Sequence, residues 1–120
     1  MYYDEDPFVE KIKGCADFPI DVETEFDNEV LFDIVFKEKV KPEEVDKVTK
    51  ALERFFIKYN RWHFKPIHYV SSMWEDAPEQ INVFTVRIHI DFGGAMAGAY
   101  IGAVKAIANS GADIYRLILN

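Results

Sequence analysis

The chain has 120 residues and a mass of 13.9 kDa, which fits a single domain. Hydrophobic residues make up 49% of it and charged residues 29%, a globular balance that excludes a disordered chain. The single cysteine, Cys15, excludes an intramolecular disulfide. The first eight residues lack the basic and apolar regions of a secretory signal, and no run of about 18 apolar residues occurs. We therefore expect a cytoplasmic protein without a membrane segment.

Negative charge is concentrated in the N-terminal quarter of the chain. The formal net charge is −7, and residues 1–33 hold eleven acidic residues against two lysines, or −9. The remaining residues hold twelve basic residues against ten acidic ones, or +2. A field of negative sign repels nucleic acid and attracts basic protein surfaces, chiefly by raising association rates. The plainer alternative is that these acidic residues only keep the protein soluble.

The elements near the N-terminus are predicted to be short. Pro7 and Gly14 bound a predicted helix over residues 8–13. A strand is predicted over residues 22–26, before a turn that contains asparagine and aspartate. Apolar residues then alternate with other residues over residues 30–37, which predicts a strand with one strongly buried face.

The rest of the chain is predicted to alternate between long helices and strands. Pro42 and the acidic residues after it are typical of a helix start, and Gly111 is typical of a helix end. The predicted elements are a helix over residues 42–60, strands over 67–74 and 81–92, a helix over 95–109 and a strand over 112–119.

The long elements follow the order β-α-β-β-α-β. Each β-α-β half crosses over right-handed, and two such halves interlock as an antiparallel sheet with both helices on one face. This order resembles the ferredoxin-like fold, and the resemblance concerns the topology of residues 29–120. We therefore predict a single α+β domain over residues 29–120, preceded by an acidic N-terminal segment over residues 1–28. The fold hosts many unrelated functions, so it implies none by itself.

The sheet face that points away from the helices is predicted to carry histidines. The pairing that best matches the apolar residues of the two middle strands sets Val70 opposite Arg87 and His68 opposite His89. Imidazoles on neighbouring strands lie close enough to chelate a metal, with Asp91 as a third ligand, or to share protons. Ordinary cross-strand contacts are the favoured interpretation of this pair.

Two further interpretations of that face remain open. Asp33, Trp74 and Arg87 lie there among apolar residues, a mixture typical of protein interfaces. Alternatively, the N-terminal segment of the chain covers the face.

The second long helix carries almost no charge. Lys105 is the only charged residue between Phe92 and Ala112. One face of the predicted helix consists of small residues, namely Ala95, Gly98, Ala99, Gly102 and Ala106. Small residues permit close approach of another element, so we expect packing within the monomer, with a subunit contact as the alternative.

The first long helix carries a basic stripe. Its residues are Lys47, Lys50, Arg54, Lys58 and Arg61. A basic stripe can contact phosphates, but a solvated helix face is the favoured interpretation beside so acidic an N-terminal segment.

The function predicted from these features is protein binding. No arrangement of nucleophile, base and oxyanion donor is recognisable, so we expect neither an enzyme nor a cofactor. We predict an inhibitor, antitoxin or immunity-type protein that masks a basic partner such as a nuclease toxin, without binding nucleic acid or membrane itself. The predicted partner-binding residues are Asp17, Asp21, Glu23, Glu25, Asp27, Asp33, Trp74 and Arg87.

The alternative prediction is a ligand-binding domain. It would bind a small molecule or a metal on the open sheet face, with His68, His89 and Asp91 as metal ligands, and it could form a homodimer.

Overall fold

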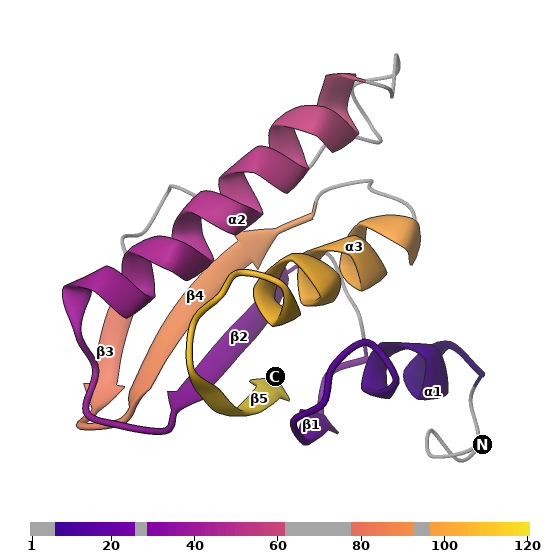
Figure 1. Ribbon diagram of the computed structural model, residues 1–120. Coiled ribbons are helices and arrows are strands. Elements are labelled where there is room, and N and C mark those ends of the chain that lie inside the picture. The colour runs from indigo at the N-terminus through magenta and orange to yellow at the C-terminus, as the bar shows by residue number, and fades with distance from the viewer. Residues whose placement is uncertain (1–6, 26–28, 62–77, 93–96) are drawn as a thin grey trace.

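A five-stranded mixed sheet with three helices forms the protein in the computed structural model, which describes residues 7–25, 29–61, 78–92 and 97–120 (Figure 1). The elements are α1 (Pro7–Lys13), β1 (Ile20–Val22), β2 (Glu29–Phe36), α2 (Pro42–Arg61), β3 (Glu79–Asn82), β4 (Thr85–Asp91), α3 (Ala97–Ala108) and β5 (Ile114–Leu119). The predicted α+β class is therefore confirmed.

The sheet differs from the predicted antiparallel one. Its strand order is β1-β5-β2-β4-β3, and β1 pairs with β5 in parallel, while the other neighbours are antiparallel. The first strand is Ile20–Val22 instead of residues 22–26, and it adds an edge to the sheet. With α1 and β1 included, the chain does not follow a strict βαββαβ order.

The predicted strand over residues 81–92 is interrupted. Val83 and Phe84 form a turn between β3 and β4, and the Phe84 amide donates a hydrogen bond to Asn82 Oδ1 at 2.9 Å. An asparagine side chain that accepts from the backbone two residues later stabilises such a turn, although the turn residues themselves are apolar. The β3–β4 register sets Glu79, not Val70, opposite Arg87, so that predicted pairing is wrong. Residues 67–74 lie outside the described part of the chain.

The core lies between the sheet and the two long helices, which cover the same face of the sheet (Figure 1). On β2, the four apolar residues of the predicted alternation are buried, because successive strand side chains point to opposite faces. Asp33 on the opposite face is buried as well. The helix α2 contributes Val48 and Leu52, and α1 contributes Ile12, each at most 1% exposed. The N-terminal helix is therefore part of the same hydrophobic core.

The small-residue face of α3 packs within the monomer at Ala99 and Gly102, whereas Gly98 is exposed and Ala95 lies outside the described residues. Ala99 and Ala103 are fully buried, and a Cβ atom on Gly102 would overlap the ring of Phe55 from α2. The absence of a side chain at position 102 allows the two helices to approach closely. On the other side, Tyr100 contacts Phe8 of α1 edge-to-face, with ring centroids 6.2 Å apart.

Replacing Gly111 with alanine and replacing Gly98 with alanine are expected to change stability in opposite directions. Gly111 follows α3 with a φ of 86°, so Gly111→Ala should lower the free energy of unfolding by about 1–2 kcal/mol. Gly98 lies inside α3 with open space around it, so Gly98→Ala should raise that energy by about 0.5–1 kcal/mol. Urea unfolding followed by circular dichroism measures both. Equal shifts in the same direction would contradict the assigned backbone conformations.

Candidate functional site

One row of residues crosses all five strands on the sheet face away from the helices. Neighbouring Cα partners in this row are Glu79 on β3, Arg87 on β4, Asp33 on β2, Ile118 on β5 and Asp21 on β1. Charged side chains therefore gather on this face from segments far apart in the sequence. Of the predicted binding residues, Asp21, Asp33 and Arg87 are brought into the same row.

The centre of this row is an ion pair with two hydrogen bonds. Arg87 Nε donates to Asp33 Oδ1 at 2.7 Å, and Arg87 Nη2 donates to Asp33 Oδ2 at 2.9 Å. Asn120 Nδ2 also donates to Asp33 Oδ2, at 2.8 Å. The Asp33 side chain is only 7% exposed, whereas that of Arg87 is 34% exposed. These hydrogen bonds link β2 to β4 and to the residue that follows β5, and they leave little of the Asp33 carboxylate exposed.

Hydrogen bonding to Asp33 raises the pKa of Arg87, and the charges of Asp33 and Glu79 add to this effect. The guanidinium is therefore a fixed positive charge on the sheet face. The sequence pattern placed Asp33 and Arg87 on one face, but the direct pairing across 54 positions emerges only from the strand register.

A second ion pair joins β1 to β5. Arg116 Nη1 lies 3.4 Å from Asp21 Oδ2, and both side chains are about two-fifths exposed. Arg116 Nε is buried and has no hydrogen-bond partner within the described part of the chain. One of the four acidic side chains near β1 is therefore paired, because Asp21 shares its charge with this arginine.

Three predicted binding residues are exposed beside β1. They are Asp17 before the strand and Glu23 and Glu25 after it, and we call them the acidic rim. The predicted residues Asp27, His68 and Trp74 lie outside the described residues.

The predicted metal ligands are partly described. His89 and Asp91 lie on β4, and His89 Nε2 is 3.5 Å from Glu29 Oε1. Among the described residues, no group of three or more His, Cys, Asp or Glu side chains is arranged to hold a metal ion.

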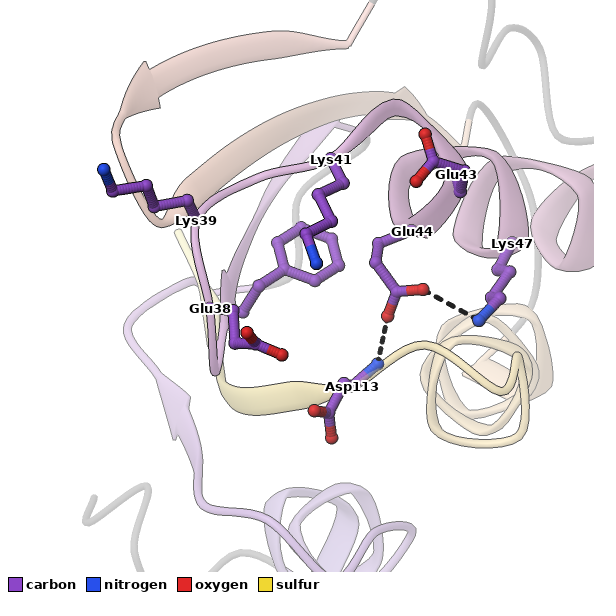
Figure 2. Close-up of a pocket in the computed structure, with 8 residues that line it drawn as sticks. Glu38, Lys39, Lys41, Glu43, Glu44, Lys47 and Asp113 are labelled. Carbon is purple, nitrogen blue, oxygen red and sulfur yellow. Dashed lines mark hydrogen bonds and ion pairs between the residues drawn. The ribbon is translucent and has the colours of Figure 1, made fainter.

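A hollow of about 380 Å³ lies at the start of α2 (Figure 2). Its lining residues are Phe36, Glu38, Lys39, Lys41, Glu43, Glu44, Lys47 and Asp113. Glu44 accepts hydrogen bonds from Lys47 Nζ at 2.8 Å and from the Asp113 amide at 2.7 Å. These hydrogen bonds lower the pKa of Glu44, and the bond from Lys47 has the larger effect. Because both signs of charge line the hollow, it offers little net attraction to a simple ion.

The basic stripe of α2 is exposed along its length. Lys47 pairs with Glu44 one turn earlier, and Lys50 lies 3.3 Å from Asp46. Pairs at these helical spacings are typical of a solvated helix face.

The fold and the charged row define the class of the protein. It is an α+β protein in which one face of a mixed sheet is covered by helices and the other carries charged side chains. None of the described helices is both long and apolar enough to cross a membrane. The chain has no significant match among protein-family models, curated proteins or solved structures.

Proposed function

We propose that the protein binds a basic protein partner through the acidic rim and masks it. The partner class is a nucleic-acid-acting enzyme, so the role is that of an inhibitor, antitoxin or immunity-type protein. The observation that carries this proposal is the exposure of the Asp17, Glu23 and Glu25 carboxylates around a strand that belongs to the sheet.

The backbone of the acidic rim is anchored on both sides of β1. The Leu117 amide donates to the Pro19 carbonyl at 3.0 Å, and the Glu23 amide donates to the Leu119 carbonyl at 2.7 Å. Carboxylates on a fixed backbone lose less conformational entropy on binding than those on a loose tail. Their field also speeds the encounter with a cationic cleft.

The other predicted binding residues that the structure describes are Asp21, Asp33 and Arg87, and each of them lies in an ion pair. Asp33 and Arg87 hold the sheet face together, and Asp21 is shared with Arg116. Asp27 and Trp74 stay proposed contacts. We further propose that residues 29–120 form a ferredoxin-like unit to which residues 1–28 add the partner-binding segment.

Removal of the acidic-rim charges tests this function. Capture of the partner from a lysate of the source cell at low and high salt identifies it, and association is then measured with the purified partner. In the variant Asp17→Asn/Glu23→Gln/Glu25→Gln, we expect the association rate at low salt to fall about tenfold or more.

The matched control removes three exposed carboxylates elsewhere, in the variant Glu38→Gln/Glu43→Gln/Glu53→Gln. Both variants change the net charge equally, so only a local effect separates them. Equal association rates for the two variants would contradict the proposed role of the acidic rim.

A further inference from the structure

We draw no further inference here: the strongest candidate, the apolar surface patch that Val83, Phe84 and Tyr115 form beside the β3–β4 turn, carries nothing because no feature of the described residues shows what covers it.

Discussion

Replacing Phe92 with alanine is expected to lower the free energy of unfolding by about 3–5 kcal/mol. Phe92 follows β4, is fully buried, and contacts one aromatic ring from each of β2, α2 and α3. Its ring centroid lies 6.1 Å from that of Phe32 on β2, 6.0 Å from Phe56 on α2 and 4.2 Å from Tyr100 on α3. Truncation therefore leaves a cavity where the sheet and both long helices meet. Urea unfolding followed by circular dichroism measures the loss.

Two further substitutions serve as controls for Phe92→Ala. Phe92→Leu keeps most of the volume but loses the ring, so it should cost less than the alanine substitution, about 1–1.5 kcal/mol. Ile57→Ala truncates an exposed side chain and should stay within about 0.5 kcal/mol of the wild type. A Phe92→Ala loss no larger than that of Ile57→Ala would be incompatible with a buried aromatic centre at this position.

Replacing Asp33 with asparagine is expected to lower the free energy of unfolding by about 1–3 kcal/mol. The substitution keeps the side-chain shape but removes the charge and one of the two acceptors that Arg87 uses. The range is below that of a fully buried pair because the Arg87 side chain is 34% exposed and retains some contact with water. Thermal and urea unfolding at neutral pH give the value.

A double-mutant cycle separates the ion pair from other effects of the substitution. Combined with Arg87→Gln, Asp33→Asn should cost much less than it does alone, since its partner is already absent. Asp21→Asn, in the exposed pair with Arg116, should change stability by less than about 1 kcal/mol. Additive losses for Asp33 and Arg87 would refute their coupling.

The Asp33 variant also separates structure from binding. Because its carboxylate is covered, Asp33→Asn should leave partner association nearly unchanged at a temperature where the variant stays folded. The acidic-rim variant should show the opposite pattern, with altered association and nearly unaltered stability. The two variants together distinguish residues that hold the sheet from residues that contact a partner.

Local periodicity alone identified the main elements of this protein. Alternation predicted residues 30–37 as a strand with one buried face, and helical spacing predicted the helix from Pro42 to about Asn60, close to its observed end at Arg61. In both elements one face packs against the core, so the spacing of apolar residues within a short stretch of sequence is enough to predict the element. The acidic N-terminal quarter is also a property of the sequence itself, as is the prediction of protein binding that rests on it.

Only the tertiary structure shows the features that depend on contacts between residues far apart in the sequence. The β3–β4 turn lies within a continuous apolar alternation, and β1 is too short for a pattern; its place beside β5 depends on hydrogen bonds between segments almost a hundred residues apart. Likewise, α3 is covered at Gly102 because this glycine meets Phe55, and Asp33 is neutralised because Arg87 lies opposite it. Strand register and helix packing are set by the whole chain at once, so no local window contains them.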